Sequence, residues 1–568
     1  MEQKNKKERW LIFWILIAGF LFRVIGVSFG LPHLYHADEP ILINHAMAYG
    51  AGDFNPHFFK IPPLVSYILF ILYGIYFLLG AAIGLFSNPF NFAAHFITNP
   101  ASFYLIARFF LGVLTGTATV YFLFCLTKKH FSYERALLTA TFLATCFIHI
   151  QDSHYAYVDM PLLLILTIAL SSILDLLDGG SKKAYVLVGF WVGLAVAVKY
   201  NGVFLVAPVF AAHYFRHRNF ISAVTDVKII LSAFVSCLTF AALNSFSLID
   251  FHFFYHQILE QGQAEHFLGW GHHFFYSLIG GIGLPAVIAG ILGMIMCGVS
   301  LNTKKVVLSI FCICYYLILC VKSQQYARYV LPIVPFMLFF ASDFLLNIKE
   351  RWKLNRVSFG VLIICILTPS IAKACVTDWL FLKPDARTVA LSWAKVNLDN
   401  HSKVALGPQF FTPRFSMDLT QITQKEREIG EKNNHLKTQQ LRLKVLKEQA
   451  LKKEDFQAEL FFLSDEIKIT NAFLFSTPRL PYNVNRLIDA RIDYVVVSPF
   501  EKPRQIDFFD NLKQNAVFIH RVTPFRDGKQ ELDYDPYAVT AAPFIWHDLI
   551  SRNSLGQVVD FYEFKRDG

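Results

Sequence analysis

Two adjacent carboxylates, Asp38 and Glu39, stand in the segment HLYHADEP, directly after the first long apolar run of the chain. A carboxylate at a membrane surface can act as a general base that takes a proton from an acceptor hydroxyl or amine. Its neighbour could then position the acceptor or hold a cation, with His36 beside both. Taken alone, the pair also fits an ordinary solvated turn before Pro40, so its meaning depends on which other residues lie near it.

Further polar residues stand within or at the ends of apolar segments, where ionisable groups are rare and usually face a cavity in which they work. Arg108, Lys199 and Arg328 are the basic members. Arg binds phosphate through two parallel hydrogen bonds and Lys binds it as a point charge. A phosphate bound there would belong to a lipid whose chain lies in the bilayer. For each residue taken singly, snorkelling toward lipid headgroups is the alternative. The other members of this polar set are Arg23, His36, Lys60, Asp152, His154, Asp159, Tyr200 and Tyr329.

The composition is that of an integral membrane protein. Of the 568 residues, 55% are hydrophobic and only 17% are charged, whereas a soluble protein carries about 25% charged residues. The net charge of +10 does not indicate nucleic-acid binding, because the basic residues fall between apolar runs, where they set membrane topology. All nine cysteines lie in or beside apolar runs, without disulfide or zinc spacing. The first apolar run lacks a cleavage site and is predicted to be an uncleaved anchor.

The basic clusters predict the topology of the chain. They lie at 4–9, 128–135, 182–183, 216–218, 304–305 and 349–356. The positive-inside rule places all of them on the cytoplasmic face. A single crossing of the bilayer by the apolar segment 61–86 would put the cluster at 128–135 and every later cluster on the external face instead. We therefore predict one external loop, 31–101, in which 61–86 lies parallel to the membrane or re-enters it. A double crossing by 61–99 is the alternative and keeps the same parity. About eleven crossings result, with 11 to 13 as the predicted range.

Residues 1–376 thus form a predicted transmembrane domain, and residues 377–568 form a predicted α/β soluble domain on the external face. The segment 421–455 is charged and has a helical pattern with only one apolar seven-residue seam. It is predicted to be a long surface helix or a hairpin inserted into the soluble domain. Docking of a partner protein on this segment is the alternative to a solvated helix.

Several stretches together resemble the GT-C glycosyltransferases, namely the dolichyl-phosphate-mannose protein mannosyltransferases and the bacterial aminoarabinose transferases. They are Arg23 followed by HADEP, the KIPPL element, HYAYVDMPLLLILTIAL with AVAVKYNGVFLVAP, and YARYVLPIVPFMLFFAS. The likeness covers roughly residues 10–400. The insertion 421–455 and most of the sequence after it resemble no family that we can name.

The resemblance implies transfer of a hexosyl or pentosyl group from a polyprenyl-phosphate donor, in a single displacement at the external membrane face. Asp38 would be the general base, and Glu39 would help to position a substrate. Lys199 and Arg328 would bind the donor phosphate. Arg108 is a third phosphate candidate from its charge and position, while the resemblance gives Arg23 and Arg108 a role in supporting the site. The leaving phosphate is already an anion at neutral pH, so no cofactor and no essential metal are expected. The remaining supporting or substrate-binding residues would be Arg23, His36, Lys60, Asp159, Tyr200 and Tyr329.

The acceptor is left open by the sequence as a protein, a lipid or a glycan. A transporter or flippase of lipid-linked sugars is the main alternative, because it too needs a charged cavity that binds a lipid phosphate. A scaffold that recruits partners through 421–455 is a third reading. Compact loops favour a bacterial inner membrane, with the C-terminal domain in the periplasm.

Overall fold

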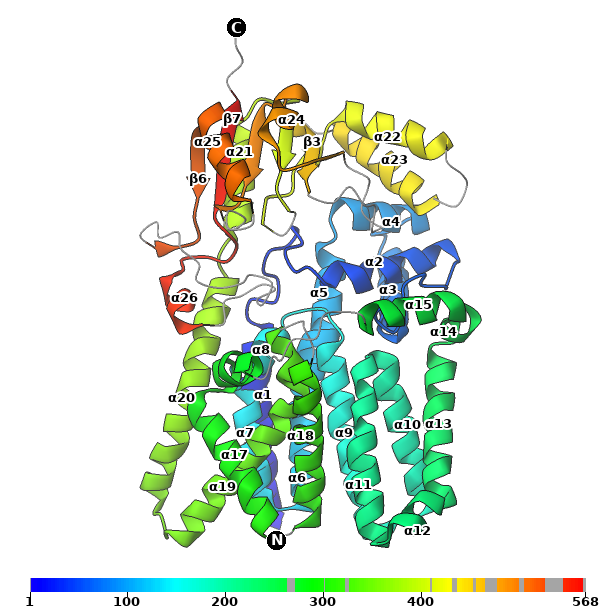
Figure 1. Ribbon diagram of the computed structural model, residues 1–568, viewed down its shortest axis with the longest axis vertical. Helices are drawn as coiled ribbons and strands as arrows, with labels where there is room; N and C mark the ends of the chain where they lie inside the picture. The colour runs from blue at the N-terminus through cyan, green and yellow to red at the C-terminus, as the bar shows by residue number, and fades with distance from the viewer. Residues whose placement is uncertain are drawn as a thin grey trace.

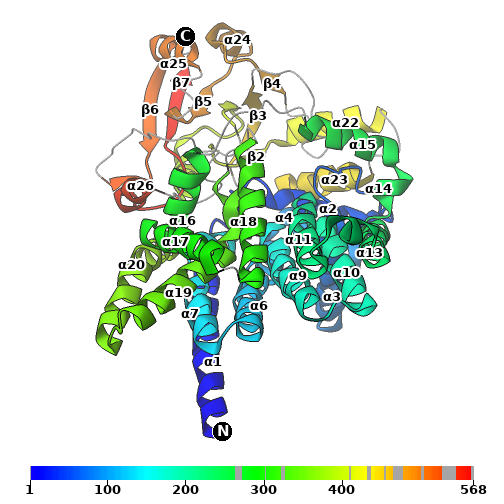
Figure 2. The same cartoon turned by 60° about the horizontal axis from the view of Figure 1, so that its bottom comes forward.

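The computed structural model describes residues 2–262, 271–300, 302–321, 326–408, 411–431, 437–452, 456–464, 478–499, 505–526 and 545–564. It has a bundle of long helices and, at one end of the bundle, a smaller α/β part (Figure 1). Figure 2 shows the N-terminus of α1 projecting from the bundle end that is remote from the sheet. The predicted class, a polytopic helical protein with a C-terminal α/β region, is therefore confirmed.

The bundle is built from helices whose sequences are apolar almost all round, as helices in lipid must be. Within the described residues, six helices are long and apolar enough to cross a membrane, or seven if the bent pair His272–Ile282 and Leu284–Gly298 counts as one span. The total of 11 to 13 crossings stays a prediction. The bundle helices are α1 (Glu2–Val24), α5 (Ala101–Ala107), α6 (Thr115–His130), α7 (Tyr133–Ala144), α8 (Phe147–Asp152), α9 (Asp159–Gly179), α10 (Lys182–Val198), α11 (Val206–His217), α12 (Phe220–Thr225), α13 (Val227–Leu243), α16 (Ile279–Ile282), α17 (Leu284–Ser300), α18 (Thr303–Val321), α19 (Val334–Arg351) and α20 (Arg356–Phe381).

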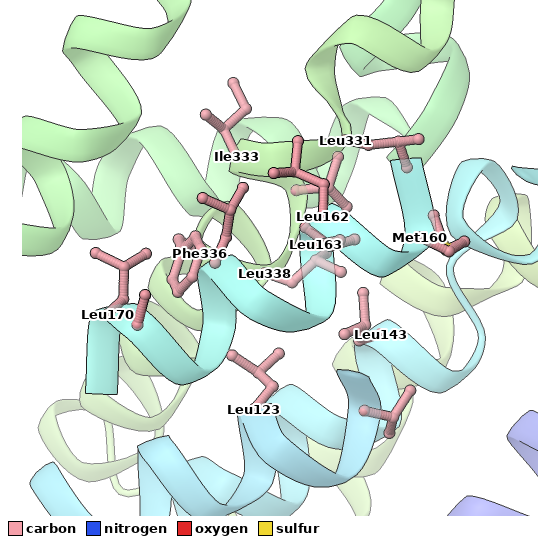
Figure 3. Packing of buried hydrophobic residues seen from close by; sticks show 14 of the residues in the cluster. Leu123, Leu143, Met160, Leu162, Leu163, Leu170, Leu331, Ile333, Phe336 and Leu338 are labelled. Carbon is pink, nitrogen blue, oxygen red and sulfur yellow. The ribbon is translucent and has the colours of Figure 1, made fainter. Parts of the chain in front are cut away.

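Large aliphatic side chains fill the centre of the bundle. Figure 3 shows Leu123 from α6, Leu143 from α7, Leu163 from α9 and Phe336 from α19 packed in one cluster. Glycines permit the closest helix pairs. A Cβ on Gly193 would lie 2.4 Å from the Ser236 carbonyl oxygen, so α10 and α13 meet backbone to backbone, as small residues allow in membrane proteins.

Between the bundle and the α/β part lies a layer of helices (Figure 1). Helix α3 packs on α2 in this layer. By length and composition α3 also qualifies as a span, and neither property fixes its orientation. The membrane-parallel placement of 61–86 therefore stays a prediction. The helices of the layer are α2 (Glu39–Ala48), α3 (Leu64–Ala82), α4 (Pro89–Thr98), α14 (Phe246–Ile249) and α15 (Phe251–Gly262).

The α/β part contains a seven-stranded sheet, with strand order β2-β3-β1-β5-β7-β6 and β4 beside β3. The central strands β3, β1 and β5 are parallel, and β7 runs antiparallel to β5 and β6. Strand β5 reads YVVV and is buried throughout, as expected for a parallel strand covered on both faces. The strands are β1 (Lys403–Leu406), β2 (Ser416–Met417), β3 (Gln457–Leu463), β4 (Arg479–Leu480), β5 (Tyr494–Val497), β6 (Ala516–Val522) and β7 (Val559–Phe564).

Helices complete the α/β part and connect it to the layer below. Within the segment 421–455 the structure has two helices packed on each other, which is the hairpin form of the two alternatives. The second helix of this hairpin also packs on α4, and Lys444 lies 5.4 Å from the ring of Phe90. The helices are α21 (Ala386–Asn397), α22 (Leu419–Glu431), α23 (Lys437–Lys452), α24 (Val484–Asp489), α25 (Ile506–Asn515) and α26 (Trp546–Ser551).

Candidate active site

Four charged side chains from separate parts of the chain form a continuous network. Arg328 Nη2 donates to Asp38 Oδ2 at 2.6 Å, and Arg328 Nε lies 3.7 Å from Asp159 Oδ2. Lys199 Nζ donates to the other oxygen of Asp159 at 2.5 Å. The four side chains are between 3% and 22% exposed, and Asp38 is the most accessible of them. The network can therefore meet a substrate at Asp38, while its inner carboxylate Asp159 stays buried.

Breaks in regular helix structure place these residues. Lys199 ends α10 in an extended conformation, at φ −155° and ψ 134°, and a 3-10 segment follows it. Arg328 lies in the 3-10 segment Ala327–Ile333, which contains Pro332 and leads into α19. Asp159 is the first residue of α9, where the helix dipole favours a carboxylate. Non-helical backbone at membrane depth is tolerated where protein buries it or where it lines a cavity, so these breaks mark the site.

Asp38 and Glu39 are adjacent in sequence but have different surroundings. Glu39 is fully buried and receives two parallel bonds from Arg108, at 2.7 and 2.8 Å, and a third from the Ala156 amide at 2.9 Å. Burial alone would raise the pKa of Glu39, but the Arg108 guanidinium reverses this effect and holds the pKa below its usual range. Glu39 is thus an ionised, saturated group that anchors the start of α2.

Arg108 therefore pairs with Glu39, whereas the sequence suggested that it would bind the donor phosphate. It begins a π-helical segment, Arg108–Leu114, between α5 and α6. Its Nη1 donates to the carbonyls of Val27 and Phe29, and the side chain is fully buried. With Nε and Nη2 on Glu39, the guanidinium is occupied on all sides. The geometry assigns Arg108 to holding Glu39 in place.

Tyrosines enclose the two cations of the network. The Arg328 guanidinium lies 5.1 Å from the ring of Tyr157 and 4.8 Å from that of Tyr326. Lys199 Nζ lies 5.8 Å from the Tyr157 ring and 5.5 Å from the Tyr329 ring. These distances suit cation–π contacts. Tyr329 was named from the sequence. Tyr157 and Tyr326 were not, although each stands two residues before a member of the network.

Asp152 adds a third carboxylate near the network. Burial raises the pKa of Asp152 to about 8, and the Asp159 carboxylate acts in the same direction, whereas Arg328 and Lys199 oppose the shift. For Asp38, burial would also raise the pKa, but Arg328, His36 and Lys199 together hold it below its usual range. At neutral pH, Asp38 is thus ionised and Asp152 carries a proton for most of the time. The sequence placed Asp152 in the polar set without giving it a role.

His36 supports the backbone at Asp38. Its Nδ1 accepts from the Asp38 amide at 3.3 Å, and its ring stacks on Tyr155 with centroids 4.4 Å apart. Burial lowers the pKa of His36 to about 4, so the imidazole is neutral. Its Nε2 is buried and has no hydrogen-bond partner among the residues that the structure describes.

Three other residues named from the sequence have their polar contacts elsewhere. Arg23 does not touch the carboxylate pair. It donates to the carbonyls of Gly19, Leu143 and Ala144 and contacts His149, and so links α1 to α7 and α8. Lys60 pairs with Glu260 on α15 at 3.2 Å. The Tyr200 hydroxyl donates to the Phe59 carbonyl at 2.7 Å. Lys60 thus holds the segment before α3 against α15 of the layer, and Tyr200 holds it against the bundle. Apolar patterning alone could not reveal these partners.

Two other groups of side chains have the spacing of a metal site within the described ranges. They are His213 with His217 and Asp226, and His130 with Asp175 and Asp178. Both groups lie at helix ends. Asp175 is sixteen residues along α9 from Asp159, which corresponds to about 24 Å of helix. Neither group is part of the Asp38 network.

Comparison with known proteins shows what this chain is similar to in sequence and in fold. A family model described as dolichyl-phosphate-mannose-protein mannosyltransferase matches residues 90–244. Among solved structures, the Archaeoglobus fulgidus oligosaccharyltransferase tethered with an NVT-containing acceptor peptide has a TM-score of 0.51 at 12% identity, covering 88% of this chain and 70% of that one. The same organism's enzyme AglB, in complex with an inhibitory peptide and a dolichol-phosphate, has a TM-score of 0.50 at 11% identity, covering 91% and 73%.

ArnT from Cupriavidus metallidurans, bound to undecaprenyl phosphate, has a TM-score of 0.45 at 14% identity, covering 90% of this chain and 96% of that one. A search against curated proteins gave no match. The chain therefore shares the fold of the archaeal oligosaccharyltransferase structures, and residues 90–244 match the mannosyltransferase family model.

Proposed function

We propose that the protein transfers a sugar from a polyprenyl-phosphate donor to an acceptor hydroxyl or amine at the external face of the membrane. The observation that carries this proposal is the network of an accessible, ionised carboxylate, Asp38, with two tyrosine-enclosed cations, Arg328 and Lys199. The network lies where helices break at one end of an apolar bundle. The bound dolichol-phosphate of the archaeal neighbour supports a lipid-linked donor.

In the proposed reaction Asp38 takes the acceptor proton while the acceptor oxygen or nitrogen attacks the anomeric carbon. The bond from that carbon to the phosphate oxygen breaks, and the electron pair leaves with the polyprenyl phosphate. Asp38 Oδ2 is engaged by Arg328, which leaves Oδ1 to receive the proton. Preorganised cations that stabilise developing negative charge are usually the largest single catalytic contribution, and this task falls to Arg328 and Lys199.

Asp159 and Glu39 have positioning roles in this proposal. Asp159 bridges Lys199 and Arg328 and so fixes the spacing of the two cations before the donor binds. When the donor phosphate arrives, it competes with Asp159 for both of them. Glu39, locked by Arg108, holds the first turn of α2 and with it the backbone of Asp38.

The acceptor is the open part of the proposal. The acceptor peptide of an archaeal neighbour makes a protein the first acceptor to test, with lipids and glycans next. We expect the C-terminal α/β part to be external, because it lies at the same end of the bundle as Asp38 (Figure 1).

The test is transfer from a radiolabelled polyprenyl-phosphate sugar in isolated membranes, with wild type and Asp38→Asn. Loss of a general base typically lowers the rate by about 10²- to 10⁴-fold, so we expect label in the acceptor to fall by that factor. Asp178→Asn is the matched control, because this exposed carboxylate pairs with Lys304 outside the network. Near-normal transfer by Asp38→Asn would contradict its role as base. Movement of donor across the bilayer without any transfer would instead identify a flippase.

A further inference from the structure

An apolar groove lies between α17, α19 and α20. It has a volume of about 490 Å³, and all its lining residues except Ser358 are apolar. Pro285 and Ile288 of α17 line one part, Phe344 and Ile348 of α19 line the next, and Trp352 lies at the turn into α20. This volume is in the range of about 300–1,000 Å³ that small-molecule sites have.

The groove faces the bilayer. Helix α20, which forms one wall, exposes Val357, Val361 and Ile364 by 76%, 55% and 63%, so its outer side meets lipid in a membrane. Water is an unsuitable occupant for walls that offer one hydroxyl, whereas hydrocarbon chains are present at high concentration around α20. The groove therefore has the volume and the apolar lining for a single acyl chain.

Cations surround the end of the groove at the α19–α20 turn. Arg351, Lys353 and Arg356 are exposed, and no described residue forms an ion pair with any of them. They alternate with Trp352 and Leu354, which line the groove. Basic residues beside an apolar cleft at a bundle end are the usual recognition elements for anionic lipid headgroups, and Arg matches phosphate with two parallel bonds.

The backbone of the turn gives a second observation. Lys353 has φ +49°, a left-handed conformation in which glycine is the favoured residue after a helix. The Leu354 amide bonds to the Lys349 carbonyl at 3.0 Å, which completes the helix end. A lysine in this position destabilises the turn relative to glycine. An attraction between its charge and an anionic headgroup would explain why a lysine occupies the position.

We propose that this groove and turn bind one anionic phospholipid, with an acyl chain in the groove and the phosphate on Arg351, Lys353 and Arg356. The occupant is distinct from the glycosyl donor. Arg328 and Arg351 stand at opposite ends of the segment that α19 completes, roughly 35 Å apart along the helix. A donor whose phosphate meets Arg328 cannot place that phosphate at the turn.

The test is native mass spectrometry of the full chain released from nanodiscs of phosphatidylglycerol or phosphatidylcholine with identical acyl chains. We expect one phosphatidylglycerol to be retained, in at least about fivefold excess over phosphatidylcholine, since each basic residue near an anionic surface contributes roughly a fivefold change in affinity. The variant R351Q/K353Q/R356Q should lose this excess. K182Q/K183Q is the matched control, because it removes two exposed lysines of another turn that do not line the groove. Equal retention of both lipids, or equal losses in both variants, would overturn the proposal.

Two further substitutions separate the groove from the charge. Cys365 lines the groove and is exposed, so Cys365→Trp should fill it and reduce retention of phosphatidylglycerol without changing the charge. Lys353→Gly should raise the lipid-free unfolding temperature while it weakens retention, whereas Lys353→Gln should weaken retention only. Full retention in both Lys353 variants would rule out the headgroup contact. Preferential retention of polyprenyl phosphate over phosphatidylglycerol would identify a different occupant and also overturn the proposal.

Discussion

At the scale of single residues, the carboxylates of the site differ in protonation because they differ in neighbours. Asp38 has a cation at 2.6 Å and stays ionised. Asp152 has another carboxylate near it, and burial raises its pKa to about 8. A proton on Asp152 at neutral pH removes one negative charge from the neighbourhood in which the donor phosphate is proposed to bind. Donor binding is therefore expected to depend on the state of Asp152.

The first prediction concerns this dependence. As pH rises through about 8, Asp152 ionises and repels the donor phosphate, so KM for the donor should increase. In Asp152→Asn the charge cannot form, and the increase above pH 8 should be absent. Donor KM measured between pH 6 and 9.5 in both proteins checks this expectation. A wild-type increase that persists unchanged in the variant would assign it to another group.

A second prediction separates Glu39 from Asp38. Removing one partner of a buried ion pair leaves an uncompensated charge, which costs about 3–5 kcal/mol, so Glu39→Gln should lower the thermal unfolding midpoint strongly. Asp38→Asn, at a side chain that is 22% exposed, should change it little. Replacing Glu39 and Arg108 together with Leu and Met should restore much of the loss. Equal midpoints for the two single variants would mean that the Glu39 pair does not stabilise the fold.

The sequence placed Asp38, Asp159, Lys199 and Arg328 in one larger polar set, because charges at the ends of apolar segments are informative by themselves. It did not identify the residues with which the buried arginines form hydrogen bonds. Arg108 and Glu39 are 69 residues apart, and Arg23 bonds to carbonyls more than 100 residues away. No local pattern encodes which of several buried carboxylates or carbonyls a buried arginine will meet, and these are the assignments that the structure changed.

At the scale of elements, close helix contacts fix the positions of the helices that adjoin the 3-10 segments of the site. Helices α17 and α19 approach at Gly293, where a Cβ would lie 2.2 Å from the Phe340 carbonyl oxygen. Helix α19 is continuous with the 3-10 segment that carries Arg328. The position of that arginine thus depends on a helix contact well inside the bundle. Apolar patterning predicted the helices here, whereas the 3-10 and π segments depend on tertiary packing and could not be predicted.

A third prediction tests this contact. Gly293→Leu should force α17 and α19 apart, and overpacking of this kind usually destabilises by about 1–3 kcal/mol. The substitution should also lower transfer activity, because it shifts Arg328. Gly298→Leu on the same helix is the matched control, since nothing lies within 4 Å of a Cβ there. The measurements are the unfolding midpoint in detergent and the transfer rate. Similar midpoints for the two variants would show that the close contact is not needed.

At the scale of the whole molecule, the distribution of basic clusters predicts which end of the bundle faces the cytoplasm. Lys304 and Lys305 lie in the first turn of α18, and Arg351 is the last residue of α19. Both helix ends lie at the end of the bundle remote from the sheet (Figure 1). The sheet and the Asp38 network lie at the other end. Composition thus predicted the class of fold. The position of the site on the external face, the number of crossings and the placement of 61–86 stay predictions, because they depend on a bilayer as well as on the chain.

A fourth prediction tests the orientation. A reporter that is active only outside the cytoplasm, fused after Gly568, should be active, because the positive-inside rule places the basic turns on the opposite face. The same reporter fused after Lys305 should be inactive. Activity with the reversed pattern would invert the topology and move the site to the cytoplasmic side.

The α/β part touches the loop that carries the proposed base. The Arg387 guanidinium lies 3.8 Å from the ring of Tyr35, and the Tyr35 hydroxyl shares a hydrogen bond of 2.9 Å with Thr388 of α21. Tyr35 stands only three residues before Asp38 in the chain. A molecule that binds the α/β part and displaces α21 would therefore move Tyr35, and the peptide backbone between Tyr35 and Asp38 would transmit this movement to Asp38. Such a ligand would change the rate of the proposed sugar transfer while it remains outside the membrane and never contacts the donor.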